Sequence, residues 1–135
     1  PDYTVSGQIT EADIATLAAQ GFGTIICNRP DSEIETDLHA RYIEAEAKRL
    51  GLGFVYNPIS SQGMTMDNVT TQSQAMEQAT GRVFAYCRSG MRSTTCWAFA
   101  KARSMPADEI IHAAQQAGYN LEGMRPQLEA MAASA

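Results

Sequence analysis

Short runs of apolar residues alternate along this chain with longer segments in which apolar residues recur every three or four positions. The runs are compact, are bounded by turn residues and carry β-branched or aromatic side chains, which is typical of buried strands. The first expected strand, near the start of the chain, is less regular and contains a turn or bend. The four expected strands are Tyr3–Ile9, Thr24–Cys27, Leu52–Tyr56 and Val83–Tyr86.

The segments between the runs carry the start and stop signals of helices. Thr10 caps a first expected helix that Gly21 ends, and a long helix is expected from Asp37 to Leu50. Thr65 or Asp67 starts the next one. The remaining helices are predicted at Ser93–Ala100, from Pro106 to Gly118, and from Met124 or Pro126 to about Met131. This alternation predicts one α/β domain over residues 1–135, in three layers, with a mainly parallel central sheet flanked by helices.

The segment from Val83 to Ala100 holds the strongest candidate for chemistry. It predicts a buried strand that leads into Cys87, then a tight loop, then the amino terminus of a helix. Free amides at a helix start and along a curled loop attract an anion and lower the pKa of a nearby thiol. Because Arg88 and Arg92 add positive charge, we expect Cys87 to be a thiolate nucleophile beside an anion pocket, rather than an inert buried cysteine.

Further candidates lie on the same loop and at the end of another strand. Arg92 and Ser93 are candidate catalytic residues with Cys87, and Ser93 either donates a hydrogen bond to the thiolate or only caps the helix. The carboxyl ends of parallel strands share one rim, which would bring Asn28 and Arg29 beside Cys87. Arg29 is then a substrate clamp or a solvated surface charge. The candidate substrate-binding residues are Arg88, Ser89, Gly90, Met91, Arg29 and Asn28.

The loop Cys87-Arg88-Ser89-Gly90-Met91-Arg92-Ser93 resembles the active loop of rhodanese-type sulfurtransferases and is similar to the phosphate loop of cysteine-dependent protein phosphatases. The wider pattern, including Gly21-Phe22-Gly23-Thr24-Ile25-Ile26-Cys27-Asn28-Arg29-Pro30-Asp31, resembles the phosphatase-like domain of the beta-lactamase-hydrolase-like bacterial proteins. This resemblance runs from about Val5 to Leu128 and implies a backbone like that of dual-specificity phosphatases. The choice between the two activities depends on individual residues.

A phosphatase mechanism would need an acid as well as the loop. Cys87 would attack phosphorus while Arg92 grips the phosphoryl oxygens, and an acid would protonate the strongly basic leaving group. Phosphatases of this kind carry an Asp on an earlier loop, but the matching loop Ser60-Ser61-Gln62-Gly63 has no carboxylate. Asp31 and Asp67 are the remaining candidates for the acid.

The loop itself also departs from the phosphatase pattern. Tyr86 stands where that pattern has His, and four residues rather than five separate Cys87 from Arg92. A sulfurtransferase needs no acid, because its leaving group is a stable anion such as sulfite or a thiolate. The preferred hypothesis is therefore a rhodanese-type sulfurtransferase that forms a Cys87 persulfide and passes the sulfur to a thiol or other acceptor. A phosphatase with a phosphocysteine intermediate is the alternative, and an anion-sensing regulatory module is the second.

Composition narrows the range of partners. A net charge of −5 argues against nucleic acid as the main partner, and no apolar run approaches the length of a membrane span. We expect a small anionic substrate (thiosulfate, a polysulfide, a persulfide or a phosphate ester) and a fused or separate sulfur-metabolism enzyme as a partner. Three cysteines without the spacing of a disulfide framework fit a reducing cytoplasm.

The other potential ligands are weak candidates. Cys27 is either a second sulfur site or a packed strand cysteine, and Cys96 is expected to lie in the core. His39 and His112 each lie alone on expected helices. Neither a metal site nor a cofactor is therefore expected.

Overall fold

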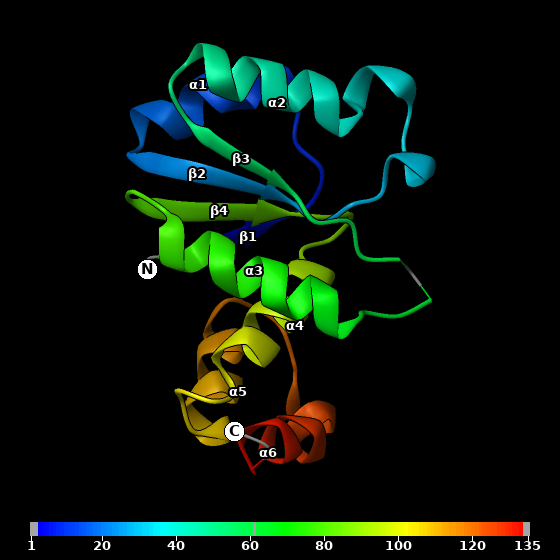
Figure 1. Ribbon diagram of the computed structural model, residues 1–135, viewed down its shortest axis with the longest axis vertical. Helices are drawn as coiled ribbons and strands as arrows, with labels where there is room; N and C mark the ends of the chain where they lie inside the picture. The colour runs from blue at the N-terminus through cyan, green and yellow to red at the C-terminus, as the bar shows by residue number, and fades with distance from the viewer. Residues whose placement is uncertain (1–2, 61, 134–135) are drawn as a thin grey trace.

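A four-stranded parallel sheet forms the centre of the protein, in a computed structural model that describes residues 3–60 and 62–133 (Figure 1). Its strands are β1 (Tyr3–Ser6), β2 (Phe22–Cys27), β3 (Gly53–Tyr56) and β4 (Arg82–Tyr86). They lie in the order β1-β4-β2-β3, so that β4 pairs with both β1 and β2. The prediction of a mainly parallel central sheet is confirmed, since each of these pairings is parallel.

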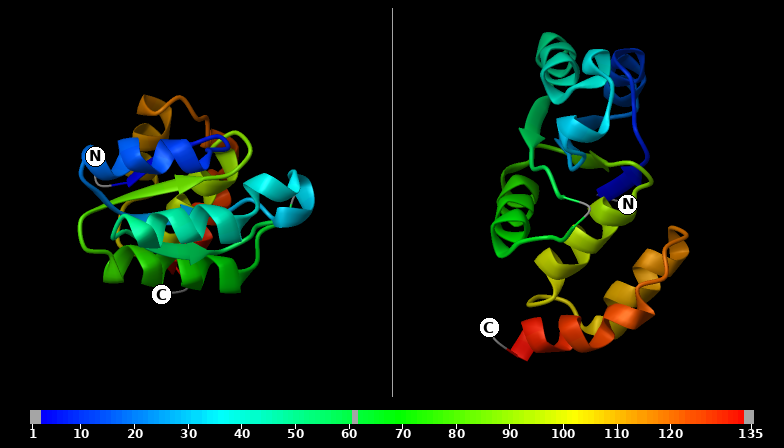
Figure 2. Two further views of the ribbon diagram at one scale, coloured as in Figure 1. Left: turned by 90° about the horizontal axis from the view of Figure 1, so that it is seen from above. Right: turned by 90° about the vertical axis from the view of Figure 1, so that its right-hand side faces the viewer.

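Helices cover both faces of the sheet. On one face lie α1 (Glu11–Ala19) and α2 (Ala40–Arg49), and on the other lie α3 (Met66–Gln78) and α4 (Met91–Lys101) (Figure 1). The predicted three layers are therefore confirmed. Two further helices, α5 (Ala107–Gln116) and α6 (Arg125–Ala133), pack against α4 and lie beyond the α3–α4 layer (Figure 2). No helix within residues 3–60 and 62–133 has the length and apolar character needed to cross a membrane.

The alternation of side chains along the strands divides the core. On β4, Phe84 and Tyr86 join the cluster beneath α1 and α2, whereas Val83 and Ala85 join the cluster on the other face. The C-terminal helices close a third cluster around Ala98 of α4. α4 therefore connects the sheet to the C-terminal helices.

The start of α2 differs from its prediction, and the start of α3 agrees with one of its two predicted caps. α2 begins at Ala40 rather than at Asp37, because residues Thr36–Leu38 form a separate 3₁₀ turn. Thr65, and not Asp67, caps α3, since its hydroxyl accepts the backbone N–H three residues further along. The Thr10 cap of α1 is confirmed, and the other boundaries agree with the predictions to within a few residues.

A buried hydrogen-bond network ties the sheet to α3 and α4. The fully buried Gln72 side chain accepts from the amides of Asn28 and Asn57, at 2.9 and 2.8 Å, and donates to the Tyr3 hydroxyl at 2.8 Å. Tyr3 in turn donates to the Ser93 carbonyl at 2.8 Å. A satisfied polar network in a low-dielectric interior fixes the relative positions of the elements that contribute to it.

We expect the substitution Gln72→Leu to lower the free energy of unfolding by about 2–4 kcal/mol, because it leaves several buried polar partners unsatisfied. The matched control is Gln74→Leu, at an exposed position on the same helix, where a change within about 0.5 kcal/mol is expected. Urea unfolding of the two variants measures the difference. Equal midpoints would show that the network contributes nothing to stability.

Candidate active site

The carboxyl ends of the four strands meet at one rim. Four residues occupy matching positions at the ends of the paired strands: Ser6, Tyr86, Cys27 and Tyr56. Cys87 directly follows β4, and Asn28 and Arg29 directly follow β2. The Asn28 N–H also donates to the Tyr86 carbonyl at 2.8 Å. The prediction that these segments share a rim is therefore confirmed.

The loop after β4 curls around the sulfur of Cys87. The Gly90 N–H donates to the Cys87 Sγ atom at 3.1 Å, and the Cys87 N–H donates to the Ser6 carbonyl at 3.2 Å. Gly90 has a φ of 94°, in the left-handed region that favours glycine. α4 then begins at Met91, two residues before the predicted start, and its first amides are left without partners inside the helix.

These amides favour the thiolate form of Cys87. Burial alone would raise the pKa of the thiol, but the backbone amides of Ser93, Ser89 and Gly90 outweigh burial and hold that pKa below its ordinary value. The Ser93 hydroxyl also lies against the sulfur, yet its single proton is donated to the Asn28 Oδ1 atom at 2.8 Å. The amides therefore stabilise the thiolate, and the Ser93 hydroxyl ties the loop to the rim.

The other two cysteines differ from Cys87 in environment. Burial raises the pKa of Cys27 to about 11 and that of Cys96 to about 12. Cys27 belongs to the core on the α1–α2 side of the sheet, and its thiol lies 3.3 Å from the Arg29 carbonyl. These surroundings favour packed cysteines over a second sulfur site.

A carboxylate that was not predicted from the sequence holds Arg92. The Nη1 and Nη2 atoms of Arg92 donate to the two oxygens of Glu33 at 2.9 and 2.6 Å, and Nη1 also donates to the Ile59 carbonyl at 2.6 Å. These bonds leave the Nε–H and the second N–H of Nη2, which form the other two-pronged side of the guanidinium. No residue of 3–60 and 62–133 accepts a hydrogen bond from that side, which has the two-donor geometry that binds a carboxylate or a phosphate.

Glu33 is an ionised partner rather than an acid. The hydrogen bonds from Arg92 lower the pKa of its carboxyl, so Glu33 carries no proton to donate at neutral pH. Glu33 lies in the short 3₁₀ turn Asp31–Glu33. Its only signal in the sequence is that it is an acidic residue shortly after the predicted rim.

Arg29 is part of the same charge cluster and is not a solvated surface charge. Its Nη2 donates to the Glu33 carbonyl at 3.0 Å, and its Nε lies 3.6 Å from the Glu33 carboxylate. Nη1 lies 3.4 Å from the Gln8 side chain, and the Arg29 side chain is only 12% exposed. Glu33 is therefore placed between two arginines.

The remaining predicted substrate-binding residues divide into two groups. Asn28 is fully buried, and its side-chain amide donates to the Asn57 carbonyl and to the Gln72 side chain. The prediction that Asn28 contacts substrate is therefore corrected. Its side chain instead accepts a hydrogen bond from Ser93 and so supports the loop. Met91 packs its side chain against the C-terminal core. By contrast, Arg88 and Ser89 are exposed, and the Arg88 side chain has no hydrogen bond or ion pair with any other residue of 3–60 and 62–133.

Within residues 3–60 and 62–133, no hydrogen bond or ion pair joins either predicted general acid to the active loop. Asp31 accepts the Ala40 N–H at 2.8 Å and thereby caps the start of α2. Asp67 is exposed in the first turn of α3. Ser61, part of the loop considered for an acid, lies outside the described residues. Within the described part of the chain, the carboxylate that contacts the active loop is that of Glu33.

A hollow of about 1130 Å³ lies away from this site. It lies between β1 and the helices α4 and α5, and apolar side chains such as Val5, Trp97 and Met105 contribute to its lining. The lining residues do not include Cys87 or the arginines around it.

Comparison with known proteins gives consistent matches. Residues 1–104 match the family described as "Beta-lactamase hydrolase-like protein, phosphatase-like domain". A beta-lactamase hydrolase-like protein of Agrobacterium fabrum is 33% identical over 99 residues, which are 73% of this chain and 23% of that protein. A protein of the same name from Xylella fastidiosa is 26% identical over 119 residues, 87% of this chain and 28% of its own length. The chain thus spans about a quarter of these relatives.

Solved structures share the fold. A putative phosphatase from Neisseria meningitidis Z2491 is 39% identical with a TM-score of 0.82, and the match covers 97% of this chain and 94% of that one. The core catalytic domain of a PP-IP phosphatase from S. cerevisiae is 12% identical with a TM-score of 0.67, and the match covers 94% of this chain and 78% of that one. The second likeness shows the fold alone. The fold is therefore cysteine-phosphatase-like, as the resemblance implied.

We expect iodoacetamide at neutral pH to alkylate Cys87 before Cys27 or Cys96. The amides around the Cys87 sulfur favour its thiolate, whereas burial disfavours the other two. The rate should rise with pH through a midpoint below that of a free cysteine. Peptide mapping over time measures the order, with Cys87→Ser as the control that leaves the two slow thiols. Earlier labelling of Cys27 or Cys96 would contradict the assignment.

Proposed function

Because the chain belongs to the family of phosphatase-like domains of beta-lactamase hydrolase-like proteins, we propose that it is a cysteine-dependent phosphatase with Cys87 as its nucleophile. One observation carries the proposal. The Cys87 thiol is surrounded by backbone amides that favour its thiolate, and nearby Arg92 is held in place by two hydrogen bonds to Glu33. The family likeness favours this function over the sulfurtransferase that the loop spacing alone had favoured.

The proposed reaction has two steps. The Cys87 thiolate attacks phosphorus, the bond from phosphorus to the leaving oxygen breaks, and that oxygen departs with the electron pair. Arg92 and the loop amides bind the other phosphoryl oxygens and stabilise the charge on them. Water then attacks the phosphocysteine, the sulfur–phosphorus bond breaks, and inorganic phosphate and the thiolate are released.

The surroundings of the loop limit the class of substrate. Glu33 is ionised by its pairing with Arg92, and Asp31 is used by the start of α2. With no placed acid in the described part of the chain, the leaving group has to depart without a proton from the protein. The proposed substrates are therefore phosphates of weakly basic leaving groups, such as aryl phosphates, acyl phosphates or phosphoanhydrides.

Sulfur transfer is the second candidate, and the four-residue spacing between Cys87 and Arg92 favours it. Here the thiolate attacks the outer sulfur of a donor, the sulfur–sulfur bond breaks, and sulfite or a thiolate leaves with the electron pair. Neither leaving group needs a proton. The lack of a placed acid among the described residues is thus compatible with both candidates.

A leaving-group series tests the proposal. We expect the purified protein to hydrolyse aryl phosphates, with kcat/KM falling steeply as the leaving group becomes more basic, because no acid offsets its charge. Cys87→Ser is the inactive control. In parallel, the mass of the protein is measured after thiosulfate or polysulfide treatment. Gain of one sulfur on Cys87, together with no hydrolysis across the series, would replace the phosphatase proposal with sulfur transfer.

We expect Glu33→Gln to lower kcat/KM by about 10- to 100-fold, because a lost charged hydrogen bond costs about 1.5–3 kcal/mol and Arg92 would lose its orientation. Arg92→Ala should have at least that effect, and Arg29→Ala a smaller one. The matched control is Glu35→Gln, at an exposed acidic position nearby. Steady-state kinetics on the best aryl phosphate measures all four, and equal values for the Glu33 and Glu35 variants would remove Glu33 from the site.

A further inference from the structure

Tyr119 reaches the active loop from the C-terminal helices, beyond the residues that match the family. Its hydroxyl donates to the Ser89 carbonyl at 2.9 Å. The segment that follows α5 returns toward the start of α4 in both views (Figures 1 and 2). The mechanism proposed above makes no use of this contact.

The hydrogen bond from Tyr119 is made to the same peptide group, Ser89–Gly90, that donates to the Cys87 sulfur. The Ser89 carbonyl and the Gly90 N–H belong to one planar peptide, and its two ends point in opposite directions. The N–H end donates to the Cys87 sulfur at 3.1 Å, while the carbonyl end accepts from Tyr119. The orientation of this one peptide therefore decides whether the sulfur receives that hydrogen bond.

Gly90 makes the peptide easy to rotate and also leaves room for Tyr119. Glycine tolerates both signs of φ, so the residue itself does little to prevent the peptide from turning over. A Cβ atom on Gly90 would lie 2.1 Å from the Tyr119 hydroxyl oxygen and 2.9 Å from the adjoining ring carbon. The tyrosine hydroxyl thus occupies space that only glycine leaves empty.

The position of Tyr119 is itself well supported. Its N–H donates to the Ala114 carbonyl at 2.9 Å, just after Gly118 turns the chain out of α5 with a φ of 97°. The ring packs against the C-terminal core. Burial raises the pKa of the hydroxyl, which therefore remains a hydrogen-bond donor at neutral pH.

We propose that Tyr119 is a positioning residue that holds the Ser89–Gly90 peptide with its N–H directed at the Cys87 sulfur. The C-terminal helices then take part in forming the active loop, although they lie outside the part of the chain that matches the family. The consequence for turnover rests on the proposed function. The consequence for the thiol does not.

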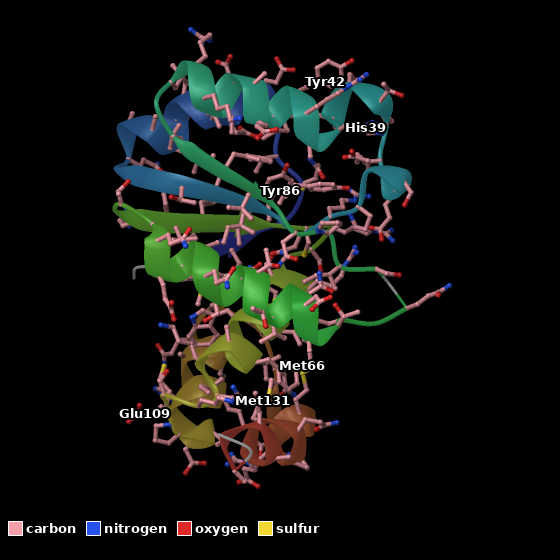
Figure 3. The ribbon with its side chains drawn as sticks, in the orientation of Figure 1. His39, Tyr42, Met66, Tyr86, Glu109 and Met131 are labelled. Carbon is pink, nitrogen blue, oxygen red and sulfur yellow. The ribbon has the colours of Figure 1, made fainter. Side chains whose placement is uncertain are left out.

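Tyr119→Phe tests this, because it removes the hydroxyl and keeps the ring. We expect iodoacetamide to react about two- to tenfold more slowly with Cys87 at neutral pH, because the peptide loses one hydrogen bond that holds its orientation. The rate profile should move to higher pH, and kcat should fall by a similar factor with KM little changed. The control is Tyr42→Phe, at a tyrosine on α2 in the layer across the sheet (Figure 3).

The outcomes separate this inference from the proposed function. An unchanged alkylation profile in Tyr119→Phe overturns the inference, whether or not turnover falls. A shifted profile in a protein that hydrolyses no phosphate supports the inference and removes the phosphatase proposal. Thermal unfolding establishes that the variant is folded. Hydrogen exchange of the Gly90 amide, expected to quicken in Tyr119→Phe, then provides a second readout, and unchanged exchange would also overturn the inference.

Discussion

The ring of backbone amides around the Cys87 sulfur is the arrangement on which the rest of the site depends. A thiolate in a buried position is unfavourable unless donors replace the water it has lost. The loop supplies those donors, and Ser6, Ser93 and Tyr119 hold the loop in place from β1, the buried network and the C-terminal helices. The neighbouring contacts therefore act mainly through the geometry of a few peptide groups.

The charged side chains beside the loop hold Arg92 in position. Glu33 lies between Arg92 and Arg29, and its pairing with Arg92 keeps its pKa low. A carboxylate with a depressed pKa adds stability above its unfolded pKa and loses that stability as the pH falls through its folded pKa. Acid should therefore loosen Arg92 from its position. The same pairing keeps Glu33 ionised, so Glu33 does not supply a proton to a leaving group, which links the placement of Arg92 to the class of leaving group.

The fold and the chemistry point to the same nucleophile but constrain function differently. The family match and the solved structures establish a cysteine-phosphatase-like fold, which favours hydrolysis of a phosphate. The short loop, and the lack of an acid in contact with it within residues 3–60 and 62–133, favour a reaction whose leaving group needs no proton. Phosphates of weakly basic leaving groups satisfy both constraints. That is why the proposed function is narrower than the family likeness alone would support.

The sequence by itself determined the features that depend on neighbours along the chain. These are the parallel α/β alternation, the rim shared by Cys87 and Asn28, and a loop whose amides favour a thiolate, since strand direction and helix starts are local properties. Only the tertiary structure decided which side chains meet there. Glu33 reaches Arg92 across 59 positions and Tyr119 reaches Ser89 across 30, and no local periodicity marks such contacts. The burial of Asn28 was decided in the same way, because its partners Asn57 and Gln72 come from later elements whose packing the sequence pattern does not specify.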